Sequence, residues 1–172
     1  MKQMQDIRNE TVPLIRDTCM ALTGHANDNE VAQMLGTAVA ESSLIHRVQI
    51  DGGPARGLWQ MEPTTGVDIF ENYLMHYMQR DRFYALMEIW LELAMRKFVP
   101  YIVDVEHHLE KYDDFACAMA RIHYLRNPDP IPDTLEGQAK YWLKAYNRGG
   151  KGTVEHYLAQ WDALECDKLM ED

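Results

Sequence analysis

Residues 41–63 read "ESSLIHRVQIDGGPARGLWQMEP", and this stretch separates two segments with helical spacing of apolar residues. The turn "DGGP" (51–54) cannot continue a helix. The following "ARGLWQM" (55–61) is short enough for a strand or an irregular extended segment. Pro63 then stands at the first position of a new helical pattern, where its fixed φ is favourable. The stretch therefore predicts a small extended or β region between helices.

The helix before this stretch has a strong apolar pattern. Asn27 followed by Glu30 three residues later resembles a capping box and predicts the helix start. Glu41 and Ile45 fall at the edge of the apolar face. At about 100° per residue, the residues predicted to share that face are Val31, Met34, Leu35, Ala38, Val39 and Ser42.

Helical patterns dominate the rest of the chain. They cover residues 11–22, 62–79, 81–112 with a break near Pro100, 113–125, 136–148 and 154–164. A proline-rich extended piece (126–134) and a glycine break (149–153) separate the last three, and Thr153 is placed to cap the final helix. The sequence predicts a mainly α protein with about seven helices, folded as a single domain over residues 1–172.

Composition excludes several classes of protein. The 172 residues carry 17 Lys and Arg against 27 Asp and Glu, a net charge of -10. That balance argues against a nucleic-acid binder, which needs a basic face, and against adhesion to anionic membranes. Three distant cysteines without CxxC spacing predict buried, reduced thiols: Cys19, Cys117 and Cys166.

No targeting or membrane segment is recognisable. The first residues, "MKQMQDIRNETVP", lack the apolar core of a signal peptide. The apolar stretch at 83–95 contains Glu88 and Glu92 and is too short to span a bilayer. We expect a protein made in a cytoplasm that reaches other compartments only when something carries or releases it.

Glu41 is the candidate acid, although periodicity alone favours an ordinary glutamate beside an apolar face. Its neighbours at helical spacing, Ala38 and Ile45, are apolar, so we expect the carboxyl to be partly desolvated. Desolvation raises the pKa of a glutamate, as a general acid near neutral pH requires.

Three short motifs occur in a fixed order: "AES" at 40–42, "GLWQM" at 57–61 and "AYNRGG" at 145–150. Together they resemble the spaced motifs of lytic transglycosylases in the lysozyme-like superfamily. Residues 52–65 and 141–158 are also similar to segments of phage virion and lysis proteins. The resemblance implies a helical lysozyme-like fold with a groove for peptidoglycan glycan strands, and a phage virion or infected-host cytoplasm as its location.

The resemblance also implies roles for individual residues. Glu41 would be the catalytic acid and base, with Ser42 bonding near the cleaved sugar or supporting Glu41. Gly57 and Gln60 would shape or line the groove. Tyr146 would lie close to the Glu41 carboxyl and orient it, and Asn147 would brace the neighbouring backbone. Where the family often has Met in its second motif, this chain has Trp59, for which a core position is the commoner fate of a lone Trp and sugar stacking the alternative.

A hydrolytic lysozyme of the inverting type would need a second carboxylate to position water. Asp51, in the turn, lies near the position where goose-type lysozymes place an acidic residue, but Asp before Gly is also a common turn former. Both interpretations of Asp51 stay open. Glu62 is better explained as a helix N-terminal acid, and Asp68 as a solvated helix residue.

Other chemistry has weak support. Asp104 and His108 have the i, i+4 spacing of metal ligands, but a third ligand is missing, so we expect a surface ion pair, and no metal or cofactor. "NRGGKG" (147–152) follows no strand and predicts a helix end rather than a phosphate loop.

The leading hypothesis is a glycosidase that cleaves the MurNAc–GlcNAc β-1,4 bond as a lytic transglycosylase. The alternatives are a hydrolytic lysozyme using Glu41 and Asp51, or a catalytically inactive virion protein with a lysozyme-like fold. The expected partners are glycan strands and other virion proteins, without nucleic acid or membrane insertion.

Overall fold

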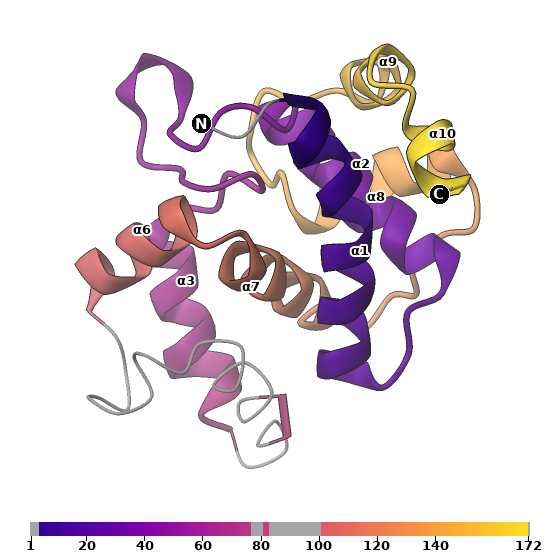
Figure 1. The fold of residues 1–172 in the computed structure, drawn as a ribbon. Helices are drawn as coiled ribbons and strands as arrows, with labels where there is room; N and C mark the ends of the chain where they lie inside the picture. Colours follow the sequence, from indigo (N-terminus) through magenta and orange to yellow (C-terminus); the bar gives the residue numbers. More distant parts are fainter. Residues whose placement is uncertain (1–3, 77–80, 83–100, 172) are drawn as a thin grey trace.

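The computed structural model describes residues 4–76, 81–82 and 101–171 (Figure 1). This part of the chain is mainly helical, as predicted. A 3₁₀ turn, η1 (Ile50–Gly52), precedes α3, and a π-helical turn, η2 (Phe70–Leu74), follows it. The described residues contain eight α-helices: α1 (Met4–Thr23), α2 (Asp28–Ser42), α3 (Pro63–Ile69), α6 (Ile102–Lys111), α7 (Asp113–Leu125), α8 (Leu135–Ala145), α9 (Val154–Ala163) and α10 (Cys166–Glu171).

Helix α2 forms the centre of the packing. It contacts α1, α7, α8, α9 and α10, while α1 also packs on α7 and α3 on α6 (Figure 1). The predicted apolar face is buried, since Val31, Met34, Leu35, Ala38 and Val39 are all 0% exposed. Each large apolar side chain buried in this way contributes roughly 1.5–3 kcal/mol. Helix α2 is therefore a firmly held support for the residues at its C-terminal end.

The start of α2 confirms the predicted capping box. Asn27 Oδ1 accepts the Glu30 N–H at 3.0 Å, and Glu30 Oε2 accepts the Asn27 N–H at 3.1 Å. Two of the free N–H groups at the helix start are thereby satisfied.

The end of α2 differs from the sequence-based expectation. Ser43 and Leu44 both adopt left-handed conformations, with φ of 52° and 56°, and the Ser43 N–H caps Val39 O at 2.9 Å. Ile45 consequently does not continue the helical face and is 48% exposed. The prediction that Ile45 desolvates Glu41 is wrong, because the chain turns before it reaches that position.

Residues 45–62 form an irregular excursion, with no regular strand in the described structure. Two isolated bridges pair Arg56 with Val48 and with Met61. Trp59 is 0% exposed, and its indole N–H donates to Met34 O at 3.0 Å. Trp59 is therefore a core residue, and it fastens the excursion to α2.

Gly57 is required by the close approach of this excursion to α6. It has a φ of +76°, and a Cβ added to it would lie 2.3 Å from Leu109 O. Gly24 has the same φ of +76° but nothing within 4 Å of an added Cβ. We expect Gly24→Ala to cost roughly 1–2 kcal/mol from the left-handed conformation alone. Gly57→Ala should cost at least about 1 kcal/mol more, because the backbone must also shift. Urea unfolding of both variants measures the difference; equal losses would contradict the packing argument.

The starts of three other helices agree with the sequence, whereas α1 begins at Met4, seven residues before the predicted start at residue 11. Helix α3 starts at Pro63, α7 spans the predicted 113–125, and Thr153 Oγ1 accepts the His156 N–H at 3.1 Å to start α9. The predicted break near Pro100, and most of the helical pattern before it, lie outside the described residues.

Asp104 and His108 do not form the expected surface ion pair. His108 is only 7% exposed, and its Nδ1 donates to the main-chain oxygen of Asp104 at 2.7 Å. The Asp104 carboxylate instead accepts the Tyr101 N–H at 3.1 Å at the start of α6. Capping of the helix end outcompetes the i, i+4 pair, because it satisfies a main-chain donor.

The three cysteines are free and buried, as predicted. Burial raises the pKa of Cys19 to about 11 and that of Cys166 to about 12. Because the thiolate is the reactive form, these thiols are unreactive near neutral pH.

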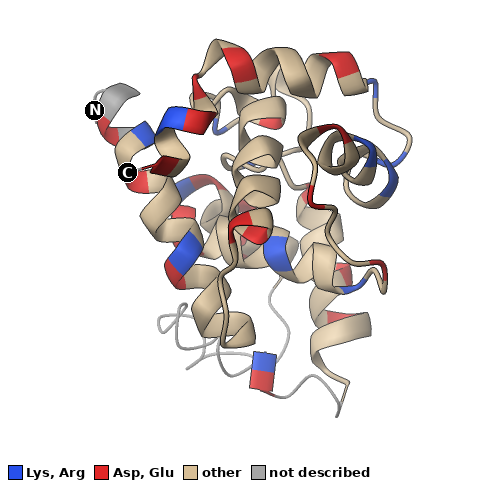
Figure 2. Cartoon of the chain, turned by 90° about the vertical axis from the view of Figure 1, so that its right-hand side faces the viewer, with Lys and Arg blue, Asp and Glu red and all other residues tan. Residues whose placement is uncertain are grey.

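Charged residues are distributed over the helices rather than gathered by sign. Figure 2 shows basic residues scattered among acidic ones in that view. Among the described residues, no helix combines the length and the apolar character needed to cross a bilayer.

Candidate functional site

Glu41 lies in the last turn of α2 and is partly buried. Its Oε1 accepts two hydrogen bonds, from the indole Nε1 of Trp142 at 2.9 Å and from Nδ2 of Asn147 at 3.2 Å. Both donors come from the segment that ends α8, about a hundred residues later in the sequence. The carboxyl is therefore held in one position rather than free on the helix surface.

The surroundings raise the pKa of Glu41. Burial is the main cause, because it disfavours the charged form. The hydrogen bonds from Asn147 and Trp142, and the nearby His156, oppose the increase without cancelling it. His156 Nε2 donates to Ala40 O at 2.9 Å, which places its ring beside the end of α2. The result is a carboxyl of the kind that can hold a proton nearer neutral pH.

The end of α8 brings the two donors together. Trp142 is 1% exposed, and its main-chain oxygen accepts both the Tyr146 N–H and the Asn147 N–H at 2.9 Å. This tightening of the last turn folds Asn147 back toward Trp142. A buried indole N–H needs an acceptor, and Glu41 provides it.

Tyr146 lines the same cavity as Glu41, but Asn147 rather than Tyr146 makes the hydrogen bond to the Glu41 carboxyl. The Tyr146 hydroxyl donates to Trp59 O at 2.9 Å, so it braces the backbone of the excursion. Asn147, expected to brace the backbone, is the residue that donates to Glu41. Burial, and secondarily the Glu41 charge, raise the pKa of Tyr146, so its hydroxyl stays protonated.

Ser42 makes no hydrogen bond to Glu41 in the described structure. The residue is 3% exposed, and its hydroxyl donates to Ala38 O at 2.9 Å, one turn earlier in α2. It therefore belongs to the helix backbone and the core rather than to the site.

A cavity of about 500 Å³ lies beside Glu41. Gln60 lines it and also fixes the local backbone, since its Nε2 donates to Gly57 O at 2.8 Å and His46 O at 3.0 Å. Gln60 therefore both lines the cavity and holds the turn at Gly57. The walls of the cavity are formed by Glu41, His46, Gln49, Ile50, Ala55, Gln60, Met61, Glu62, Thr65, His123, Tyr146, Asn147, Arg148 and Gly150.

The three acidic candidates for a second carboxylate occupy different places. Asp51 is exposed, has a φ of 67° and does not line the cavity, as a turn-forming residue would behave. Asp68 pairs with Arg126 at 2.6 Å and also lies outside the cavity. Glu62 is the N-cap residue of α3 and shares the cavity wall with Glu41. Of the three, only Glu62 is placed near the candidate acid.

His123 is a cavity residue that the sequence analysis missed. Burial, together with the positive charges of Arg126 and Arg148, lowers its pKa to about 4, so the ring is neutral at physiological pH. Its ring meets that of Tyr146 edge to face, with centroids 5.2 Å apart. The helical pattern of α7 gave no sign that His123 would face the excursion.

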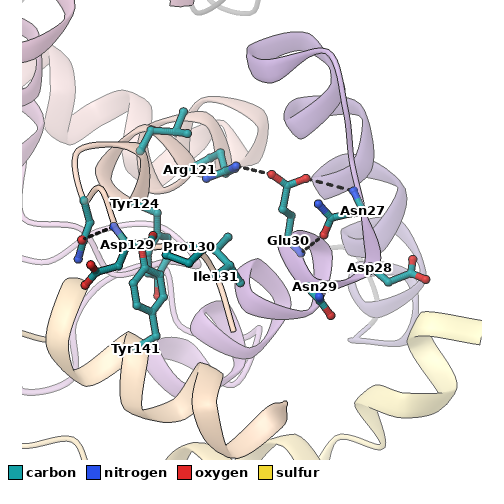
Figure 3. Close-up of a pocket in the computed structure, with 12 residues that line it drawn as sticks. Asn27, Asp28, Asn29, Glu30, Arg121, Tyr124, Asp129, Pro130, Ile131 and Tyr141 are labelled. Atoms are coloured by element: carbon teal, nitrogen blue, oxygen red, sulfur yellow. Dashed lines mark hydrogen bonds and ion pairs between the residues drawn. The ribbon is translucent and has the colours of Figure 1, made fainter. Parts of the chain in front are cut away.

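A second cavity, of about 630 Å³, lies at the other end of α2 (Figure 3). Arg121 Nη2 pairs with Glu30 Oε1 at 2.6 Å, with side chains only 5% and 6% exposed. Figure 3 shows this pair between the helix start at Asn27 and the loop that carries Asp129. Glu30 thus serves both the capping box and a buried ion pair, and no feature of the sequence pattern indicated the second function.

Within the described residues, no group of three or more His, Cys, Asp or Glu side chains is arranged to hold a metal ion. Comparison with known proteins adds no assignment: no protein-family model matches the chain, and no curated protein and no solved structure is significantly similar to it.

Proposed function

We propose that the protein cleaves the MurNAc–GlcNAc β-1,4 bond of peptidoglycan as a lytic transglycosylase, with Glu41 as acid and base. The observation that carries the proposal is the Glu41 carboxyl itself. It is partly buried, its pKa is raised, its Oε1 is held by two donors, and it lines a cavity of about 500 Å³. The ordered motifs around Glu41, Gln60 and Asn147 and the mainly helical class are compatible with a lysozyme-like fold, which is part of the proposal.

The reaction needs only one carboxyl. Protonated Glu41 gives its proton to the glycosidic oxygen as the bond from that oxygen to the anomeric carbon breaks. The 6-hydroxyl oxygen of the same muramoyl residue then bonds to the anomeric carbon, and its proton passes to the Glu41 carboxylate. The products are a 1,6-anhydro end and a free 4-hydroxyl, and Glu41 is protonated again.

A hydrolytic lysozyme is the second candidate, and the position of Glu62 is the observation that favours it. Inverting hydrolysis needs a base that positions water across the sugar from the acid. Glu62 lines the cavity with Glu41, whereas Asp51 does not. In a hydrolase of this kind, Glu62 would take the part that the sequence analysis gave to Asp51.

We further propose that the enzyme is carried to the wall in a phage particle or released at lysis. The net charge of -10 is unsuited to free adhesion to anionic wall polymers, so delivery or tethering by other virion proteins fits better. In that setting the enzyme would open the wall locally.

Mass spectrometry of purified peptidoglycan after digestion distinguishes the candidates. Anhydro-muramoyl ends are expected for the transglycosylase, and reducing ends would replace that proposal with the hydrolase. Intact walls at enzyme concentrations where a known muramidase digests them fully would favour an inactive virion protein instead.

Glu62→Gln, with Asp51→Asn as its matched control, tests the second carboxylate. We expect both variants to keep most of the wall-degrading rate, because transglycosylation needs no positioned water. A hundredfold or greater loss in Glu62→Gln alone, an effect typical of losing a general base, would assign Glu62 that role. The same loss in Asp51→Asn alone would instead identify Asp51 as the second carboxylate of a hydrolytic lysozyme. Initial rates of release of soluble muropeptides give the comparison.

A further inference from the structure

The glycine turn after α8 lies directly against both residues that hold Glu41. A Cβ added to Gly150 would lie 1.8 Å from Asn147 Oδ1, and one added to Gly152 would lie 2.2 Å from the Trp142 ring. At Gly150 and Gly152, the side chains of Asn147 and Trp142 occupy the space that the side chain of any other residue would need. Gly149, between Arg148 and Gly150, has open space around an added Cβ despite its φ of +76°.

The Asn147 amide is held by the hydrogen bond of its nitrogen and by the close approach of Gly150 to its oxygen. Asn147 Oδ1 is buried and has no hydrogen-bond partner in the described structure, whereas Nδ2 donates to Glu41. Gly150 lies against Oδ1 and leaves Nδ2 facing the carboxyl. The indole N–H of Trp142 can only donate, so neither partner can accept a proton from Oε1 in this arrangement.

The two oxygens of Glu41 are therefore not equivalent. Oε1 receives both hydrogen bonds. Within the described part of the chain, Oε2 receives none, and it is not among the fully buried polar atoms. A proton on Oε1 would have to displace a donor, whereas a proton on Oε2 displaces nothing.

We propose that residues 147–152 form a positioning element, in which Gly150 and Gly152 hold Asn147 and Trp142 so that Oε1 is a permanent acceptor and Oε2 gains and loses the proton. The role of this element in catalysis rests on the proposed function. The hydrogen bonds to Oε1 and the packing of the two glycines do not depend on it. Asn147, Trp142 and the two glycines are positioning residues that act through Glu41.

Other titratable groups face the Glu41 carboxyl, and their influence on its titration must be distinguished from that of the glycine turn. His156 lies beside it from α9, and Tyr124 on α7 feels its charge. The remaining charged or titratable groups lining the shared cavity are His46, Glu62, His123, Tyr146 and Arg148. Because these neighbours are the same in every turn variant, a difference between turn variants reports on the turn.

The test follows the indole ¹⁵N–¹H resonance of Trp142 through a pH titration. The resonance is identified by its loss in Trp142→Phe. We expect it to titrate with Glu41 in the unaltered protein and to become independent of pH in Glu41→Gln. Gly150→Ala should raise the midpoint by roughly half a pH unit or more, because Asn147 must move and a donor to the charged form is lost.

Gly149→Ala is the control for backbone strain in the same turn: its φ of +76° disfavours Ala, but the added Cβ would not touch Asn147. Its midpoint should equal that of the unaltered protein. Asn147→Ala removes the same donor and serves if Gly150→Ala does not fold. A Trp142 resonance that fails to follow Glu41, or equal midpoints in Gly150→Ala and Gly149→Ala, would overturn the proposal.

Wall digestion on the same variants separates this inference from the proposed function. If the unaltered protein digests walls, the pH dependence of its rate should move in Gly150→Ala together with the resonance. If it digests nothing while the resonance titrates as expected, the positioning element stands and the transglycosylase proposal fails.

Discussion

Glu41→Gln should reduce the release of muropeptides from purified cell walls by at least about a hundredfold, the scale of a lost general acid. Gln keeps an oxygen that can accept from Trp142 and Asn147, so the local geometry should persist. It cannot deliver a proton to the glycosidic oxygen. Clearing of a turbid wall suspension, followed over the linear range, measures the loss, and full activity in this variant would exclude Glu41 as the acid.

The same variant has an expected stability with a definite sign. The pKa of Glu41 is raised above its ordinary value of 4.5, so the folded protein holds this proton more tightly than the unfolded chain. Its contribution to stability is therefore present below about pH 4.5 and is lost as the pH rises through the folded pKa. Glu41→Gln should melt at or above the temperature of the unaltered protein at pH 7, and the difference should vanish near pH 4. If the thermal midpoint of Glu41→Gln at pH 7 is instead lower than that of the unaltered protein, lost stability would explain any lost activity.

Activity of the unaltered protein should follow the protonated form of Glu41. Because the acid must carry its proton before the bond breaks, the rate should fall as the pH rises past the raised pKa.

The folding control for Glu41→Gln is Glu62→Gln, which removes a carboxyl from the same cavity wall.

Arg121→Met should produce the largest loss of stability, roughly 3–5 kcal/mol, because it leaves the Glu30 charge buried without its guanidinium. At about 2–4 °C per kcal/mol for a chain of this size, the thermal midpoint should fall by roughly 6–20 °C. Met matches much of the length of the Arg side chain, so the lost packing is small. Calorimetry and urea unfolding at pH 7 give the two measures.

Two further variants identify the cause of that loss. Lys140→Met breaks an exposed ion pair with Glu136, whose side chains are 64% and 65% exposed, and should change stability by less than about 1 kcal/mol. The double variant Glu30→Gln with Arg121→Met should recover part of the loss, because Gln at this position can still complete the capping box. If Arg121→Met costs no more than Lys140→Met, the buried pair is not a principal support of α2.

The helical framework was predictable because its signals are local. Asn27 with Glu30, Pro63 and Thr153 each start a helix through contacts within a few residues, and the structure places all three at helix starts. The apolar face of α2 follows from spacing alone. Trp59 was correctly assigned to the core, since a lone Trp is most often buried.

The contacts of the site were less predictable, because they depend on side-chain directions at irregular turns. Tyr146 and Asn147 are adjacent, and the tightened end of α8 decides which of them reaches Glu41. Trp142 was missed, although its indole N–H, once buried, had to find an acceptor on another element. Only the fold shows that this acceptor is Glu41.

The acidic candidates show the same limit. Asp51 and Glu62 lie eleven positions apart in the excursion, and the left-handed turn at Asp51 takes that residue away from the cavity. The sequence left both interpretations of Asp51 open, and the structure places it in the turn and outside the cavity. Whether Glu62 would face Glu41 depended on how the excursion folds back onto α2, which no local signal fixes.

The separation of Glu41 from its donors, 101 and 106 residues along the chain, has a consequence for the order of events during synthesis. When the ribosome has completed α2, neither residue that donates to the Glu41 carboxyl has yet been synthesised. The carboxyl acquires its buried surroundings only after the segment through Gly152 has emerged and packed. A partly made chain therefore lacks the hydrogen bonds and the burial around Glu41, which require α8 and its glycine turn to pack over the end of α2.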